Sequence, residues 1–119
     1  MVKDFLHADK KIYDSVHGFI PFDEFEKELI QAFLDAAPDL ITAFVKAVEA
    51  NDVSKAVYAS HTLKGSSRSI GANQFALVAE EAEKAARTGD METCRKVAPD
   101  LEINFQNFAE AGAEFLAAA

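Results

Sequence analysis

The sequence predicts an all-α protein, built as an antiparallel up-and-down bundle of helices with an additional N-terminal helix or arm. Apolar residues recur at steps of three and four from about residue 22 onward, which is the spacing of one face of an α-helix. The connections between these periodic segments are only a few residues long, so consecutive helices should run antiparallel. No segment alternates polar and apolar residues over a useful length, which argues against strands.

The chain is expected to form one domain with an N-terminal extension. It has 119 residues, half of them apolar and ten of them Phe, which is enough material for a hydrophobic core. Residues 22–119 form the predicted bundle. Residues 1–21 are predicted to form an arm or a short helix that docks on the bundle, because Gly18 and Pro21 interrupt any longer helix there.

Two helical segments are predicted between residues 23 and 50. Asp23 can cap the first, which continues to Leu34. Pro38 suits the first turn of the second, whose apolar residues at steps of four are Leu40, Phe44 and Val48. The two segments could also be nearly continuous, with a bend at Pro38.

A third helix is predicted from near Asp52 to about Ser69. Its core stripe follows steps of three and four and comprises Val53, Ala56, Val57, Ser60, Leu63, Ser67 and Ile70. Gly71 is expected to end this helix, because glycine adopts the left-handed conformation that helix ends commonly need.

The remaining sequence predicts a fourth helix and a last one. Asn73 is a plausible cap for the fourth, whose inward residues are Phe75, Val78, Ala79, Ala82 and Ala86. The turn at 88–90 ends it, and Asp90 can cap the helix that follows. Pro99 should kink that last helix or mark a new start.

Composition and charge exclude several classes of protein. The net charge of −8 argues against a general nucleic-acid binder, because phosphate backbones demand a basic face. No apolar run approaches the length of a membrane span, and the N-terminus lacks the apolar segment of a secretory signal. The single cysteine, Cys94, fits a reducing compartment. We therefore expect a cytoplasmic protein that does not associate with membranes, and a monomer, since the bundle closes its own core.

The charge distribution singles out the middle of the chain. Residues 53–79 contain no Asp or Glu, whereas Lys55, Lys64 and Arg68 lie inside this window. An acidic protein that keeps one region free of acid is expected to meet a negative group there. Uneven charge by chance in a core-rich helix is the alternative interpretation.

His61 is the candidate reactive residue. It lies one position past Ser60 of the core stripe, about 100° around the helix, so its ring should reach solvent. An imidazole nitrogen is a competent nucleophile near neutral pH, because the neutral ring is well populated there. Its expected surface neighbours are Val57, Tyr58, Lys64, Gly65 and Arg68.

Three of these neighbours suit a phosphorylated imidazole. Lys64 can pair with an arriving phosphoryl group, and Arg68 extends the positive rim. At position 65, glycine avoids a side chain that would crowd the ring. A glycine inside a helix lowers stability by about 1 kcal/mol relative to Ala, so its presence suggests a structural or functional role. Allowing close approach of a partner is one such role, and allowing close packing of a neighbouring helix is the other.

The string His61-Thr62-Leu63-Lys64-Gly65-Ser66-Ser67 resembles the signature of histidine-containing phosphotransfer (HPt) domains, in which the phospho-acceptor heads a His-x-Leu-Lys-Gly-Ser string. Residues 70–72, with the sequence Ile-Gly-Ala, follow at the usual distance. Other similar positions are Phe75-Ala76, Ala79, Ala82-Glu83 and the turn at 88–90. The resemblance covers roughly residues 22–116 and is most specific around His61.

This resemblance implies a four-helix bundle core and a phosphoprotein of a two-component phosphorelay. His61 would take a phosphoryl group from an aspartate of a response-regulator receiver domain, which brings magnesium, and hand it to another. A sensor or hybrid histidine kinase would be a further partner. In this family a Gln or Glu of the next helix commonly hydrogen-bonds the imidazole, and Glu83 lies near that position. The alternative is that Glu83 is an ordinary solvated residue of its helix.

The receiver contact is expected to combine an apolar patch with a positive rim. The patch would comprise Val57, Tyr58, Gly65 and Phe75, and Lys64 and Arg68 would rim it.

Two other function classes remain as alternatives to the carrier. One is a helical interaction module in which His61 is incidental. The other is an enzyme: residues 12–20 faintly resemble the opening segment of some metal-dependent nucleotide phosphohydrolases, but the chain has no His-Asp dipeptide, and it has no room for the ATP-binding domain of a kinase. No histidine pair has metal-ligand spacing, so neither a bound metal nor a cofactor is expected, and the protein is not expected to be an enzyme.

Overall fold

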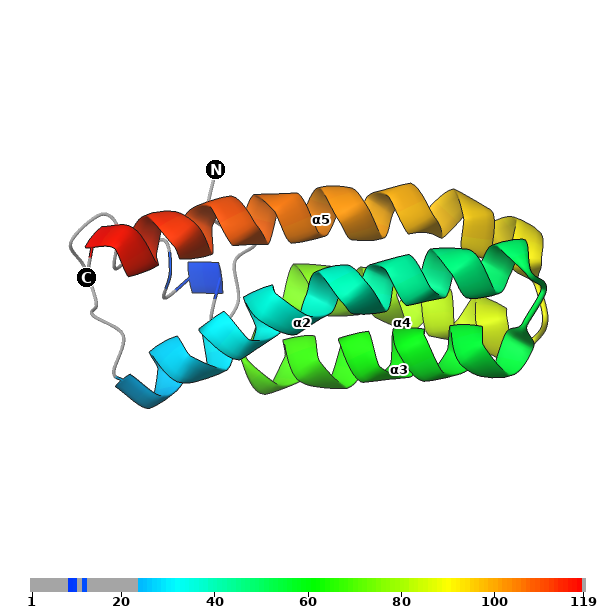
Figure 1. The fold of residues 1–119 in the computed structure, drawn as a ribbon, viewed down its shortest axis with the longest axis horizontal. Helices are drawn as coiled ribbons and strands as arrows, with labels where there is room; N and C mark the ends of the chain where they lie inside the picture. The colour runs from blue at the N-terminus through cyan, green and yellow to red at the C-terminus, as the bar shows by residue number, and fades with distance from the viewer. Residues whose placement is uncertain (1–8, 11, 13–23, 119) are drawn as a thin grey trace.

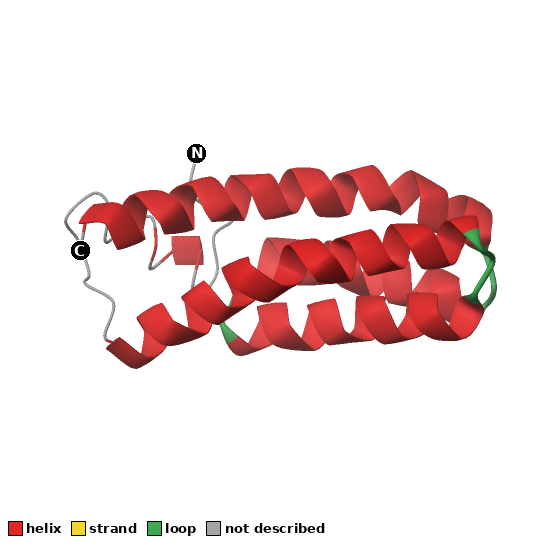
Figure 2. Cartoon of the chain, viewed as in Figure 1, coloured by secondary structure: helices red, strands yellow, loops and turns green. Residues whose placement is uncertain are grey.

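The computed structural model describes residues 9–10, 12 and 24–118. The long helices in these residues are α2 (Glu24–Glu49), α3 (Val53–Ser69), α4 (Asn73–Arg87) and α5 (Met91–Ala118). Each packs on the next along the chain, and α2 also packs on α5, which closes an antiparallel bundle (Figures 1 and 2). No strand occurs in the described part, so the predicted all-α bundle is confirmed. The predicted boundary at 21/22 and the predicted cap Asp23 lie outside the described residues.

Two prolines lie inside unbroken helices. Helix α2 continues through Pro38 and α5 continues through Pro99, so the prediction of a new helix at Pro38 is wrong and the nearly continuous alternative is right. Each proline removes one helical hydrogen bond, and both lie on the solvent side, where water can satisfy the freed carbonyl. The part of α2 that precedes Pro38 still packs on α5, because Phe33 lies against Phe105 and Phe108.

Three of the helices end on a residue in the left-handed conformation. These residues are Asn51 (φ 53°), Gly71 (φ 73°) and Gly89 (φ 74°). After α3, for example, the N–H of Ala72 donates to the carbonyl of Ser67 at 2.9 Å, which satisfies a carbonyl that the helix leaves free. The prediction that Gly71 ends the third helix is confirmed.

The helix starts are capped by different means. The side chain of Asp52 accepts from the backbone N–H of Lys55 at 3.1 Å, and Asp90 accepts from that of Thr93 at 3.1 Å, as predicted for Asp90. The predicted cap Asn73 is wrong, because it is already the first residue of α4. The cap position belongs to Ala72, which makes no side-chain hydrogen bond there.

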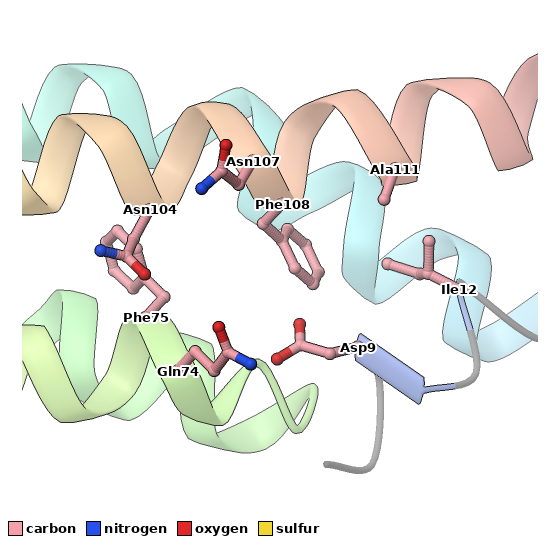
Figure 3. A pocket seen from close by; sticks show the side chains of 8 residues that line it. All are labelled: Asp9, Ile12, Gln74, Phe75, Asn104, Asn107, Phe108 and Ala111. Carbon is pink, nitrogen blue, oxygen red and sulfur yellow. The ribbon is translucent and has the colours of Figure 1, made fainter. Parts of the chain in front are cut away.

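A cap for α4 comes from the N-terminal segment instead. The carboxyl of Asp9 accepts a hydrogen bond from the backbone of Gln74, in the first turn of α4. Asp9 and Ile12 are both buried and line a small cavity between α4 and α5 (Figure 3). The other residues around this cavity are Gln74, Phe75, Asn104, Asn107, Phe108 and Ala111.

The core changes character along the bundle. An aromatic cluster in which Phe33 packs against Phe75, Phe105 and Phe108 fills the part near this cavity. Most of the buried residues of α3 and α4 are small, with Leu63, Phe75 and Glu83 as the larger exceptions; the small ones include Ala56, Ala59, Ser60 and Ser67 on α3, and Ala79, Ala82 and Ala86 on α4. Small residues at a helix contact allow a short interaxial distance, so longer side chains at its edge can reach across. That edge carries the candidate site.

No helix in the described residues is long and apolar enough to cross a membrane.

Candidate functional site

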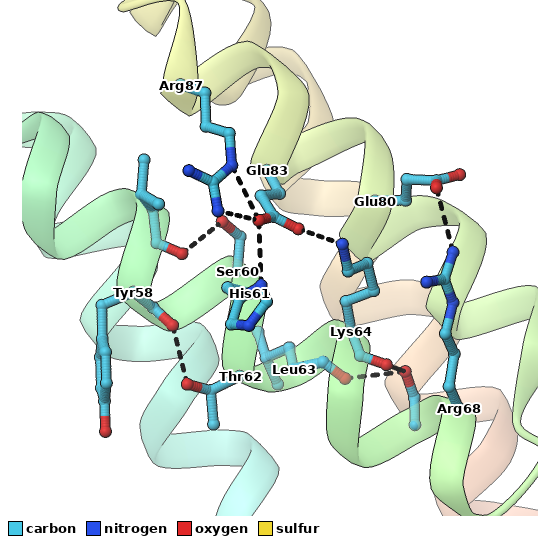
Figure 4. A network of polar contacts seen from close by, with 12 residues as sticks. Tyr58, Ser60, His61, Thr62, Leu63, Lys64, Arg68, Glu80, Glu83 and Arg87 are labelled. Carbon is cyan, nitrogen blue, oxygen red and sulfur yellow. Dashed lines mark hydrogen bonds and ion pairs between the residues drawn. The ribbon is translucent and has the colours of Figure 1, made fainter.

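His61 projects from α3 at the edge of the α3–α4 contact, with 60% of its side chain exposed. Its Nδ1 lies 3.0 Å from Oε2 of Glu83 on α4 (Figure 4). The ring is therefore anchored by one nitrogen while most of its surface faces solvent. His61 therefore lies on a solvent-accessible edge of α3, as its spacing to Ser60 predicts.

Glu83 reaches this position because the apolar face of α4 ends beside it. Its neighbours along the chain and one turn away, Ala82, Ala79 and Ala86, are all fully buried against the bundle. The Glu83 side chain is only 5% exposed, unlike the solvated residue of the alternative interpretation. A carboxylate this deeply buried needs charged or hydrogen-bonding partners.

Three basic residues surround the Glu83 carboxylate. Lys64 Nζ lies 2.6 Å from Oε1, and Arg87 donates to Oε2 through Nε at 2.9 Å and Nη2 at 2.6 Å. Oε2 is also the oxygen that faces His61. Burial alone raises the pKa of Glu83, but the hydrogen bonds from Lys64, Arg87 and His61 outweigh it and lower that pKa to about 2.

The low pKa of Glu83 assigns the protons of the His61 ring. An ionised carboxylate can only accept hydrogen bonds, so Nδ1 of His61 carries the proton that it donates to Oε2. In the neutral ring Nε2 then holds the free electron pair. Nε2 can therefore act as a nucleophile without a general base, because it carries no proton that must first be removed.

Lys64 lies one turn beyond His61, as its sequence spacing requires. Its side chain is 20% exposed, and its ammonium group contacts Glu83. Lys64 is the partner of Oε1 of Glu83, and its positive charge balances this buried oxygen. The lysine therefore helps to hold Glu83 ionised as well as adding positive charge next to the ring.

Gly65 is exposed, and a Cβ built on it would meet nothing within 4 Å. The alternative that Gly65 permits close packing of a neighbouring helix is therefore wrong within the described residues. Gly65 lowers the stability of its helix and is not required for packing inside the bundle. It therefore leaves open space at the surface for a binding partner.

The predicted contact residues divide into exposed and buried ones. Tyr58 is 69% exposed, Val57 is half-buried, and Arg68 is exposed with its guanidinium 3.0 Å from Glu80. Phe75 is only 2% exposed and packs edge-on against Phe33. The expectation that Phe75 belongs to an exposed patch is wrong, because its ring is part of the aromatic core.

Arg87 was missed by the sequence reasoning. It lies four residues after Glu83, which is the spacing that brings opposite charges together on one helix face, so the pattern Glu-x-x-x-Arg was an available signal. Glu80 and Lys84 offer a second pair of opposite charges at the same spacing, so the pattern alone did not single out Arg87.

The described residues contain no group of three or more His, Cys, Asp or Glu that could hold a metal ion. Cys94 is buried, and burial raises the pKa of its thiol, which suits a packing role.

Comparison with known protein families places the candidate site within a family match. The family model described as "Hpt domain" matches residues 28–111, which is more than half of the chain and includes α3, α4 and the whole candidate site. No curated protein and no solved structure gave a significant match.

Proposed function

Because the chain belongs to the Hpt domain family, we propose that His61 carries a phosphoryl group from an aspartate of one receiver domain to an aspartate of another. The family implies histidine phosphotransfer in two-component phosphorelays, in contact with receiver domains and histidine kinases. The observation that best supports His61 as the acceptor is its ring, exposed over most of its surface and bonded through Nδ1 to the ionised Glu83.

The transfer step follows from the proton assignment. The electron pair on Nε2 of His61 attacks the phosphorus of the receiver's aspartyl phosphate. A nitrogen–phosphorus bond forms, the oxygen–phosphorus bond breaks, and its electron pair stays on the aspartate. The proton on Nδ1 remains hydrogen-bonded to Glu83, which stabilises the positive charge that the ring acquires. Onward transfer is the same step in reverse with a second receiver.

The surroundings of His61 support this step in two ways. Glu83 fixes the tautomer and the orientation of the ring, as a hydrogen-bonded carboxylate commonly does for a reactive histidine. Lys64 adds positive charge beside the ring, and a phosphoryl group carries about −1.5 to −2 charges at neutral pH. Magnesium, which neutralises the phosphoryl group during transfer, is proposed to come with the receiver.

The proposed receiver-docking surface comprises Val57, Tyr58, Gly65 and Arg68. Tyr58 supplies exposed aromatic area, and Gly65 leaves open space beside His61 for the receiver's backbone or side chains. Arg68 adds charge at the rim, although its pairing with Glu80 moderates that charge. Phe75 is left out, since its ring is buried.

We further propose that the segment around Asp9 and Ile12 acts as an arm that docks on the bundle, within the expected extension of residues 1–21. Its support is the burial of both side chains and the hydrogen bond from Gln74 to Asp9.

A cytoplasmic monomer is the proposed working form. Elution volume with light scattering would test the monomer, because a dimer would show twice the mass of 13.0 kDa.

Phosphoryl transfer from a radiolabelled receiver domain, with magnesium, tests the acceptor. Wild type should acquire label that is stable to base and labile to acid, and His61→Gln should acquire none while keeping its helicity and melting temperature. A variant with His7→Gln and His17→Gln is the matched control and should be labelled like wild type. An intact bundle that binds receivers but is never labelled would identify a non-transferring interaction module and refute the proposal.

A further inference from the structure

Arg87 and His61 share a single oxygen of Glu83. Oε2 receives Nε and Nη2 of Arg87 at 2.9 and 2.6 Å and Nδ1 of His61 at 3.0 Å, whereas Oε1 faces Lys64 (Figure 4). A carboxylate oxygen has about two lone-pair positions. Three donors therefore compete at Oε2, and the removal of Arg87 should strengthen the bond to His61.

The two cations differ in how readily they can leave Glu83. The Arg87 side chain is 58% exposed, whereas that of Lys64 is 20% exposed. Because most of its side chain is in solvent, Arg87 can rotate away from Glu83, and Lys64 would still balance the charge of the carboxylate. Arg87 is thus the movable partner and Lys64 the fixed one.

A phosphoryl group on His61 offers Arg87 a stronger partner. It brings about −1.5 to −2 charges and three acceptor oxygens, and a guanidinium can bind two of them at once. Glu83 offers one negative charge, already shared with Lys64 and His61. Phosphorylation should therefore draw Arg87 away from Glu83.

We propose that Arg87 is a positioning residue that contacts Glu83 before phosphoryl transfer and the phosphoryl group on His61 after it. The exchange has two linked effects: the guanidinium shields the phosphoryl group from water, and the vacated lone pair of Oε2 accepts more fully from Nδ1 of His61. Both effects lengthen the lifetime of the phosphohistidine. This inference rests on the proposed role of His61 as the acceptor.

Phosphoramidate, which phosphorylates histidine without a receiver, allows a direct test on the full chain. In 15N-labelled protein the side-chain Nε–H resonance of Arg87 should shift on phosphorylation. The same resonance of Arg95, an exposed residue on α5, should stay in place. An unmoved Arg87 resonance on fully phosphorylated protein would overturn the proposed exchange.

The lifetime of the phosphohistidine supplies a second readout. Arg87→Ala should shorten its half-life by about threefold or more, and Arg87→Lys should lie between, because an ammonium lacks the bidentate geometry. Arg95→Ala should match wild type. Equal half-lives for wild type and both Arg87 variants would overturn the inference while leaving His61 as the acceptor. Wild type that takes label neither from phosphoramidate nor from a receiver would overturn both proposals.

Discussion

Lys64 Nζ lies 2.6 Å from Oε1 of Glu83, and this contact joins α3 to α4 one turn along from His61. The lysine therefore has a structural partner before any phosphoryl group arrives. Its removal should affect both the fold and the transfer step, and the two effects can be separated.

Lys64→Ala should lower the free energy of unfolding by about 1 to 3 kcal/mol, because it leaves a buried carboxylate oxygen without its balancing charge. It should also slow phosphoryl transfer on the order of tenfold, the value of one charge-assisted contact in the transition state. Urea unfolding and transfer from a labelled receiver measure the two quantities.

The double variant Lys64→Ala with Glu83→Gln separates these effects. Since the amide introduced by Glu83→Gln carries no charge to balance, the double variant should be more stable than the sum of the single variants predicts. Strict additivity would show that the ion pair contributes nothing to stability.

Glu83→Gln should remove a pH dependence of stability at low pH. The pKa of Glu83 is lowered from 4.5 to about 2, so its ionised form stabilises the fold fully above pH 4.5, and this contribution is lost as the pH falls toward 2. The loss for wild type is about 3 kcal/mol over this interval. Acid titration followed by circular dichroism should show a flatter curve for Glu83→Gln.

A matched control for this titration is Glu81→Gln, which changes an exposed residue of the same helix. It should unfold at the same pH as wild type. If Glu83→Gln followed the wild-type curve as closely, the cluster of basic residues would not hold Glu83 ionised in solution.

Substitution of Gly65 should move stability and binding in opposite directions. Gly65→Ala should stabilise the protein by about 0.5 to 1 kcal/mol, because Ala is a better helix former and its Cβ would meet nothing within 4 Å. Gly65→Leu should fold equally well but weaken receiver binding at least about tenfold, since it fills the open space beside His61. Thermal melting and titration calorimetry with a receiver measure these effects.

The control for this prediction places the same side chain elsewhere. Glu102→Leu introduces leucine at an exposed position on α5 and should leave receiver affinity unchanged. Undiminished receiver affinity of Gly65→Leu would remove this position from the docking surface.

Features that depend on neighbours in the sequence were predictable, and those that depend on contacts between helices were less so. The cap Asp90 and the terminator Gly71 act within one turn of their own position, so the local pattern was sufficient. The periodicity of the fourth helix also placed Phe75 inward, correctly; its assignment to an exposed patch disregarded that stripe.

The candidate site shows the same division. The position of His61 on the helix surface followed from its spacing to Ser60. The contact with Glu83 joins residues 22 positions apart, and only resemblance to a family suggested it. Which long side chain pairs with which carboxylate depends on rotamers and burial across α3 and α4, so Arg87 remained hidden.

The cap that Asp9 gives to α4 should weaken as the pH rises. Burial raises the pKa of Asp9 from 3.8 to about 6, more than the hydrogen bond from the backbone of Gln74 lowers it. The docked state is therefore most stable below pH 3.8, and this contribution is lost as the pH rises through 6. Asp9→Asn keeps an acceptor but cannot ionise, so it should be more stable than wild type at about pH 7.5, by up to about 3 kcal/mol.

Amide exchange at Gln74 reports on this cap directly. Protection of its N–H should be greater in Asp9→Asn than in wild type at about pH 7.5, and the two should converge only below pH 3.8, where the carboxyl is protonated in both the docked and the undocked state. Asp9→Ala has no acceptor and should lower protection at both pH values. A difference between Asp9→Asn and wild type that is equal at the two pH values would mean that ionisation of Asp9 does not oppose docking. The N-terminal segment would then be held chiefly by apolar contacts such as those of Ile12.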